Sequence, residues 1–167
     1  PATLLALGAE IVATGLEGER TIPIAEFFTD FFTTALRPDE ILTEIRIPAP
    51  VSGSGGAYVK LERKVGDFAV VGVAAQVTIA ATGICARAGI GLTNVGPTPL
   101  KAHQAEALLQ GQRLDQDRMA QAAQLAAEAA RPEADLRGSV AYKRDMVRVL
   151  TIRALTRALE RAGGRVA

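Results

Sequence analysis

The sequence predicts an α+β fold in which a three-stranded antiparallel sheet packs against three helices. Short, mostly apolar segments separated by glycine turns occupy the middle of the chain, and three helical patterns follow them. Strands that come first and helices that come together afterwards are typical of a sheet with its helices on one face. The chain has 167 residues, 49% of them hydrophobic, which is enough to bury a core of this kind.

The first part of the chain predicts a smaller α+β segment. Residues 3–7 have the pattern of a helix end, which Gly8 closes. AEIVAT (9–14) and ERTIPI (19–24) are predicted strands, and the glycines of the intervening GLEGE suit a hairpin loop. IAEFFTDFF (24–32) contains four phenylalanines and predicts a short helix followed by a buried turn.

A further strand is predicted in EILTEIRIP, before a change of composition. Simple alternation divides its side chains between two faces, with Ile41, Thr43, Ile45 and Ile47 on one face and Leu42, Glu44 and Arg46 on the other. Prolines and SGSGG follow, which predict a flexible connection. We therefore expect a boundary that separates residues 1–50 from a domain at 58–167, with residues 51–57 as the linker.

The second domain is predicted to start with its sheet. YVKLERK (58–64), VVGVAAQVTIAA (70–81) and ICARAGIGLTNV (84–95) have strand patterns, and Thr82-Gly83 marks the turn between the last two. Glycines inside these strands suggest bulges or the close approach of another backbone; they are Gly72, Gly89 and Gly91.

Three helices are predicted after the strands. Thr98-Pro99 is typical of an N-cap and first helical residue, and this helix would stop at Gly111. Asp115 caps an alanine-rich helix that ends before Pro132. Ser139 caps the third helix, which runs to about residue 162.

Composition excludes several classes of function. The formal net charge of +1 argues against a nucleic-acid binder, and no apolar run has membrane-spanning length. The single Cys85 cannot form an internal disulfide, which fits a reducing cytoplasm. The sequence starts at Pro1, without methionine and within an apolar pattern, and we expect it to be part of a longer subunit.

The sequence predicts no self-sufficient catalytic or metal site. His103 lies among polar residues of a predicted helix and is interpreted as a surface histidine, and Cys85 as a buried strand residue. HExxH, CxxC and EF-hand patterns are missing from the sequence. GIGLTNVGP fits neither a dinucleotide fingerprint nor a P-loop, so no complete phosphate cradle is predicted.

A charged stretch, KLERKVGDF, directly precedes an apolar strand and leaves two interpretations open. One is a solvated strand face that ends in a Gly66-Asp67 turn, and the other is a ligand site. Alternation places Lys60 on the polar face and Arg63 on the apolar face. An arginine there is costly unless a carboxylate receives it, and Asp67 is the candidate.

Taken together, these motifs resemble a known family. AYVKLERKVGDFAVVGVAAQVTI, ARAGIGLTNVGPTPLKAHQAEALLQG and DLRGSVAYKRDMVRVLTIRAL resemble the C-terminal domain of the FAD-binding medium subunit of molybdenum hydroxylases, of the carbon monoxide dehydrogenase type. LLALGAEIV and GERTIPIAEFFTDFFTTALRPDEILTEIRIP resemble the last segment of the same subunit's FAD-binding domain. The resemblance covers essentially the whole chain.

The resemblance implies an electron-transfer function. In this family a large subunit oxidises substrate at a molybdenum cofactor, two [2Fe–2S] clusters in a small subunit carry the electrons onward, and FAD in the medium subunit passes them to an external acceptor. A cytoplasmic location is implied, with membrane association through the complex left open. A xanthine dehydrogenase-like complex and a hydroxybenzoyl-CoA reductase-like complex are open alternatives.

Three cofactor-binding residues are carried over from the resemblance. Leu42 matches a position that touches the flavin from the end of a strand, and Lys60 matches a lysine near the isoalloxazine, where a cation favours the anionic reduced flavin. Phe68 matches an aromatic position beside the ring; some relatives have tyrosine or tryptophan there, and phenylalanine stacks without donating a hydrogen bond.

The resemblance also implies that the site is shared with another part of the protein. The family's glycine loops that bind the pyrophosphate lie upstream of the residues present here, in the other half of the FAD-binding domain. This chain alone is therefore expected to bind FAD weakly or not at all and to be inactive. The alternative is an interaction module without a cofactor, which docks a partner through a basic stripe on the last helix: Arg144, Arg148, Arg153, Arg157 and Arg161.

Overall fold

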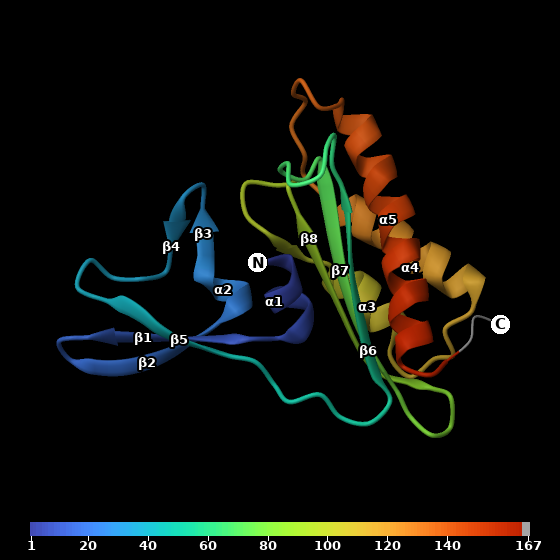
Figure 1. Cartoon of the computed structure of the whole chain (residues 1–167), viewed down its shortest axis with the longest axis horizontal. Coiled ribbons are helices and arrows are strands. Elements are labelled where there is room, and N and C mark those ends of the chain that lie inside the picture. The colour runs from blue at the N-terminus through green and yellow to red at the C-terminus, as the bar shows by residue number, and fades with distance from the viewer. Residues whose placement is uncertain (165–167) are drawn as a thin grey trace.

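Two lobes meet at the N-terminal helix in the computed structural model, which describes residues 1–164 (Figure 1). Helix α1 (Ala2–Leu7) ends at Gly8, whose φ of 69° is the left-handed conformation expected of a C-capping glycine. The other elements of the smaller lobe are β1 (Glu10–Gly15), β2 (Gly18–Pro23), α2 (Ile24–Phe27), β3 (Phe28–Asp30), β4 (Thr33–Thr34) and β5 (Ile41–Arg46).

The smaller lobe has its own core beneath an antiparallel sheet with the strand order β2-β1-β5. The predicted hairpin of β1 and β2 is confirmed, with Ile11 opposite Ile22. The core combines one side of this sheet with α1 and α2, and its buried residues are Leu5, Ala9, Ile11, Ala13, Ile22, Ile24 and Phe27.

The predicted alternation along β5 is wrong, because a bulge interrupts the strand. Leu42 pairs with Ala13 and Ile45 pairs with Ile11, although the sequence separation of Leu42 and Ile45 is odd. Cross-strand partners point to the same side of a sheet, so the irregularity between these pairs brings Leu42 and Ile45 to one face. Leu42 packs against the core of the smaller lobe, whereas Ile45 has a relative exposure of 45%.

The predicted buried turn after α2 is also wrong. Phe27 is buried, but Phe31 and Phe32 have relative exposures of 59% and 108%. They lie at the tip of the β3–β4 hairpin, beyond the core, and Phe32 has a φ of 51°. A cluster of aromatic residues therefore does not ensure burial when a hairpin carries half of it into solvent.

The larger lobe confirms the α+β class, the antiparallel sheet and the three helices. Its sheet has the strand order β6-β7-β8-β9, with every neighbouring pair antiparallel. Figure 1 shows α3, α4 and α5 on one face of this sheet and α1 on its other face. The elements are β6 (Ser54–Leu61), β7 (Val71–Ile79), β8 (Cys85–Thr93), β9 (Leu100–Lys101), α3 (His103–Leu109), α4 (Gln116–Ala129) and α5 (Val140–Arg161).

The fourth strand corrects the predicted start of the first helix. Leu100 and Lys101 pair with Leu92 and Gly91 of β8, so the chain stays extended after Pro99 and α3 begins only at His103. The caps of the other two helices are confirmed. The Asp115 side chain accepts a hydrogen bond from the amide of Arg118, and Ser139 accepts one from the amide of Tyr142.

Three glycines allow helices to lie directly on the sheet. A Cβ at Gly89 or Gly91 would overlap the backbone of α1, and a Cβ at Gly55 would overlap the backbone of α5. The predicted close approach of another backbone is thus confirmed at Gly89 and Gly91, whereas Gly72 faces the Tyr58 and Thr93 side chains.

The predicted linker at 51–57 is too long. Strand β6 starts at Ser54, and the SGSGG residues from Ser54 onward are sheet residues. The glycines suggested flexibility, but Gly55 is buried and serves the packing of α5.

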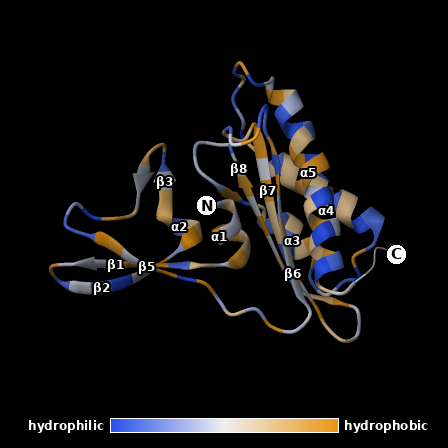
Figure 2. Cartoon of the chain, in the orientation of Figure 1, coloured by the Kyte–Doolittle hydropathy of each residue, from blue (hydrophilic) through white to orange (hydrophobic). Residues whose placement is uncertain are grey.

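The core of the larger lobe lies between its sheet and its helices. Fully buried residues come from both layers, including Val73 and Ile90 from the strands and Met119 and Leu155 from the helices. Figure 2 shows hydrophilic residues on the outer turns of α4 and α5 and apolar ones along β7. No helix within residues 1–164 has both the length and the apolar character that crossing a membrane requires.

Candidate functional site

Lys60 and Phe68 line one cavity of about 400 Å³. The cavity lies beside the start of α1, between strand β6, the loop that joins β6 to β7, and the end of β8. Its lining residues are Pro1, Ala2, Thr3, Tyr58, Lys60, Asp67, Phe68, Ala69, Thr93 and Asn94. Segments from both lobes therefore contribute to one concave surface.

The Lys60 ammonium has two anchors at this cavity. Its Nζ lies 2.5 Å from Oε2 of Glu62, and it donates a hydrogen bond of 3.0 Å to the carbonyl oxygen of Asp67. The contact with Glu62 is the main reason that the pKa of Lys60 is raised. The site thus holds a fixed cation that stays charged at neutral pH.

Phe68 presents its ring to solvent. The residue is 80% exposed, although apolar residues of this size are usually buried. The guanidinium carbon of Arg137 lies over this ring, 5.9 Å from its centroid, and Arg137 does not line the cavity. A ring that a cation supports from outside the cavity is a suitable platform for stacking.

Asp67 is the central residue of the charged stretch KLERKVGDF. Its carboxylate accepts a hydrogen bond of 2.8 Å from the amide of Phe68 and pairs with Arg63 at 3.3 Å. The Phe68 amide, followed by Arg63 and Arg137, lowers the pKa of Asp67 against the effect of burial. The predicted Arg63–Asp67 pair is confirmed, but Arg63 does not intrude on the apolar face, because β6 ends at Leu61 and Arg63 lies in the exposed loop.

Asn94 holds the other end of the same loop. Its amide nitrogen donates to the carbonyl oxygens of Ala69 and Val70, and its backbone has a φ of 63°. The Val70 amide in turn donates to the Leu61 carbonyl oxygen at 2.7 Å, which closes the base of the loop. These contacts fix where Phe68 leaves the sheet.

Leu42 does not join the other two predicted residues. It lies in β5, packs against the core of the smaller lobe and is not among the residues that line the Lys60–Phe68 cavity. The β5 bulge described above determines its direction.

Neither of the other reactive side chains forms a second site. His103 is exposed, 3.8 Å from the carboxylate of Glu106, as expected of a surface histidine. Cys85 is buried, as predicted, and burial raises its thiol pKa. Within residues 1–164, histidine, cysteine, aspartate and glutamate side chains form no group that could hold a metal ion.

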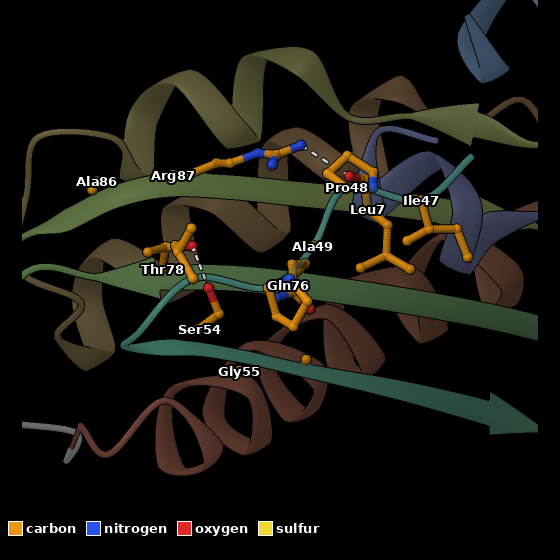
Figure 3. A pocket seen from close by; sticks show the side chains of 13 residues that line it. Leu7, Ile47, Pro48, Ala49, Ser54, Gly55, Gln76, Thr78, Ala86 and Arg87 are labelled. Atoms are coloured by element: carbon orange, nitrogen blue, oxygen red, sulfur yellow. Dashed lines mark hydrogen bonds between the residues drawn. The ribbon is translucent and has the colours of Figure 1, made fainter. Parts of the chain in front are cut away.

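A larger cavity of about 570 Å³ lies under the connection between the lobes (Figure 3). Pro48 and Ala49 cover it, and the outer face of the sheet forms its floor. Figure 3 shows hydrogen bonds among the residues that line it: Arg87 donates to the Leu7 carbonyl oxygen at 2.9 Å, and the Ser54 hydroxyl lies 3.0 Å from that of Thr78. None of the three predicted site residues lines this cavity.

Comparison with known proteins identifies the family. The family described as CO dehydrogenase flavoprotein C-terminal domain matches residues 56–158. The chain belongs to this CO dehydrogenase flavoprotein family. The FAD-binding domain of molybdopterin dehydrogenases matches residues 1–50.

Curated relatives of this flavoprotein family extend beyond the present chain. The chain is 42% identical over 162 residues to the carbon monoxide dehydrogenase medium chain of Afipia carboxidovorans, which covers 97% of this chain and 56% of the relative. It is 35% identical to the 6-hydroxypseudooxynicotine dehydrogenase complex subunit alpha of Paenarthrobacter nicotinovorans, over 97% of this chain and 55% of that relative. The chain thus spans about half the length of these relatives.

Solved structures of the flavoprotein family have the same fold. A carbon monoxide dehydrogenase from Hydrogenophaga pseudoflava that lacks the Mo-pyranopterin moiety of the molybdenum cofactor superposes with a TM-score of 0.93 at 40% identity, covering 96% of this chain and 56% of that chain. Quinoline 2-oxidoreductase from Pseudomonas putida 86 gives a TM-score of 0.82 at 29% identity, over 99% of this chain and 56% of that chain.

Sequence reasoning missed Tyr58, Asn94 and Arg137 at this site. Asn94 carried a usable signal, because asparagine adopts a positive φ more readily than most residues and the turn residues Gly96-Pro97 follow soon after it. Tyr58 lies two residues before Lys60 on the same face of β6, and burial raises its pKa. Arg137 gave no signal, because nothing local relates it to a loop 70 residues earlier.

Proposed function

We propose that this chain is part of the FAD-binding electron-transfer subunit of a molybdenum hydroxylase, which passes electrons from [2Fe–2S] clusters through FAD to an external acceptor. The observation that supports this best is the common cavity of the Lys60 ammonium and the exposed Phe68 ring, in a chain of the CO dehydrogenase flavoprotein family. A fixed cation beside a free aromatic face suits a planar ring system that gains negative charge on reduction.

The residues present fit a flavin. The cavity of about 400 Å³ is open, so a ring system can enter it while the rest of the cofactor extends outside. Gly72 leaves room for the Tyr58 hydroxyl, because a Cβ there would press against it. We therefore assign Lys60 and Phe68 to the flavin ring. Leu42 remains a proposed flavin contact from the smaller lobe, although it does not line this cavity.

The protein's part in the chemistry is positioning and charge. When bound, FAD supplies the two-electron redox chemistry. Lys60 favours the more negative state of a group in the cavity, Phe68 supplies a flat contact, and Glu62 and the Asp67 carbonyl keep the ammonium in place.

The proposal extends to domains and partners. Residues 1–50 would be the closing segment of an FAD-binding domain, and the flavoprotein C-terminal domain would begin with β6 at Ser54, after a connection shorter than the one expected from the sequence. The upstream half of the FAD-binding domain would supply the phosphate contacts. A large molybdenum-containing subunit and a small iron–sulfur subunit would be the partners in a cytoplasmic complex, and this chain alone would be inactive.

Titration with FAD tests the proposal. The full-length subunit and a chain of residues 1–167 are each titrated while flavin fluorescence is followed. We expect tight binding to the full-length subunit, which is yellow, and weak or no binding to residues 1–167. A colourless full-length subunit that binds no FAD would instead favour the interaction module that docks through the arginines of α5.

A further inference from the structure

A series of polar contacts connects helix α5 to the cavity and starts at a buried lysine. Lys143 is only 4% exposed, and its Nζ lies 2.9 Å from Oδ2 of Asp135 and 2.8 Å from the Glu133 carbonyl oxygen, to which it donates. Burying a lysine side chain this deeply is costly unless such partners receive its ammonium group. The segment before α5 is therefore tied to the body of the protein rather than free in solvent.

The second step connects Asp135 to Arg137. Oδ1 of Asp135 accepts a hydrogen bond of 2.8 Å from the Arg137 amide. Asp135 and Gly138 also exchange backbone hydrogen bonds of 3.1 and 3.2 Å. Both carboxylate oxygens of Asp135 are thus used, one by Lys143 and one by Arg137, and the turn that carries Arg137 has a defined shape.

The third step connects Arg137 to the cavity wall. Its Nη2 lies 3.5 Å from Oδ1 of Asp67, and its guanidinium carbon lies over the Phe68 ring. Asp67 is the residue whose carbonyl oxygen receives the Lys60 ammonium. One guanidinium therefore contacts both the ring and the residue that positions the cation.

We propose that Arg137 is a positioning residue for this cavity. By contacting Asp67 and Phe68 it fixes the loop of residues 62–70, and with it the direction of the Phe68 ring and the anchor of Lys60. Because Arg137 does not line the cavity, it acts through these residues and not on a ligand directly. The positioning of the loop stands by itself, whereas its effect on a flavin rests on the proposed function.

Limited proteolysis of the full-length subunit tests the positioning without any cofactor. Trypsin cleaves after Arg63 and Lys64, which lie exposed in this loop. In Arg137→Gln, initial cleavage at these bonds should be about fivefold faster, because loss of an ion pair and a cation–π contact favours local opening. Arg153→Gln, at an exposed site on α5, is the control and should cleave as the parent does.

Two further variants separate positioning from damage to the fold. Asp67→Asn keeps an acceptor for the Phe68 amide but loses the charge that Arg137 meets, so it should also accelerate cleavage. In the Asp67→Asn background, the additional change Arg137→Gln should accelerate cleavage much less than Arg137→Gln does in the parent. Both changes remove the same Arg137–Asp67 contact. Arg137→Lys should recover part of the protection, since it keeps the charge but not the planar group. Cleavage in Arg137→Gln equal to that of the parent would overturn the inference.

FAD titration of the same full-length variants tests the effect on the ligand. Arg137→Gln should bind FAD roughly three- to tenfold more weakly than the parent, and Arg153→Gln should bind it equally. Faster cleavage with unchanged FAD affinity would refute the link to the ligand. If the parent itself binds no FAD, the proposed function fails, and the cleavage rates still decide whether Arg137 positions the loop.

Discussion

Lys60 is the side chain that sets the charge of the cavity. Its ammonium is fixed by Glu62 and by the Asp67 carbonyl oxygen, and its raised pKa keeps it protonated. A unit charge about 7 Å from a second charge contributes about 2 kcal/mol at an effective dielectric constant of about 20. This lysine should therefore raise the redox potential of a bound flavin by a measurable amount.

We expect Lys60→Gln to lower the two-electron midpoint potential of FAD in the full-length subunit by about 50 mV, because the reduced state loses a nearby cation. Lys64→Gln is the matched control, since Lys64 is exposed in the same stretch and does not line the cavity. Spectroelectrochemical titration measures both potentials. Equal potentials in the two variants and the parent would remove Lys60 from the flavin site.

Glu40 provides a test of stability at the same scale. Its carboxylate accepts hydrogen bonds of 2.6 and 2.8 Å from Arg20 and one of 2.7 Å from the Arg37 amide. The Arg20 contact, followed by that of Arg37, lowers the pKa of Glu40 from 4.5 to about 2. The stabilisation is therefore complete above the unfolded pKa and is lost as the pH falls toward 2.

Replacing Glu40 should change the acid sensitivity of the smaller lobe. In Glu40→Gln the unfolding free energy should fall less between pH 6 and pH 2 than it does in the parent. The glutamine cannot be protonated in this range, so the pH-dependent stabilisation that the Glu40 carboxylate contributes is absent. Asp39→Asn, at the exposed neighbour, should keep the parent's pH dependence. Denaturant unfolding at several pH values measures this, and an equal slope for Glu40→Gln and the parent would contradict it.

Helix α1 connects the two lobes at the scale of secondary structure. Leu5 belongs to the core of the smaller lobe, while Ala2 and Ala6 pack against Ala74 on the large sheet. The absence of a side chain at Gly89 and Gly91 lets the helix backbone lie on β8. The position of α1, and of the cavity beside its start, depends on these two glycines.

Gly89→Ala should therefore lower the unfolding free energy by about 1–3 kcal/mol, because the new methyl group overlaps the Ala6 backbone. Ala86→Val adds two carbon atoms at an exposed position of the same strand and should leave stability nearly unchanged. Thermal or denaturant unfolding of the subunit measures both. A Gly89→Ala protein as stable as the parent would show that α1 is not held against β8 in this way.

Element types were predictable from local pattern, whereas the errors arise where pairing with another strand determines the structure. Capping residues such as Asp115 and Ser139 marked helix starts correctly, because a cap requires only its neighbours. The β5 bulge and the short strand at Leu100 depend on how each segment pairs with another strand, β1 and β8 respectively. Periodicity alone contains no information about such partners.

At the scale of the whole molecule, the candidate site combines residues that are close in sequence with residues that only the tertiary fold brings together. Lys60 and Phe68 are eight residues apart on one strand and its following loop, so a short motif could place them together. Arg137 and the residues of α1 reach the site only through the tertiary fold. Leu42 was assigned from the family resemblance of EILTEIRIP, and its direction is determined by a bulge that the sequence of this strand does not reveal.

Photolabelling with an azido-substituted FAD tests most directly whether the Lys60–Phe68 cavity receives the flavin. The full-length subunit is irradiated with the bound analogue, with excess FAD as competitor, and the labelled peptides are identified by mass spectrometry. We expect label on the peptide that carries Phe68, and its loss when FAD competes. Competable label confined to peptides that line the larger cavity, around Ser54 and Arg87, would contradict the assignment.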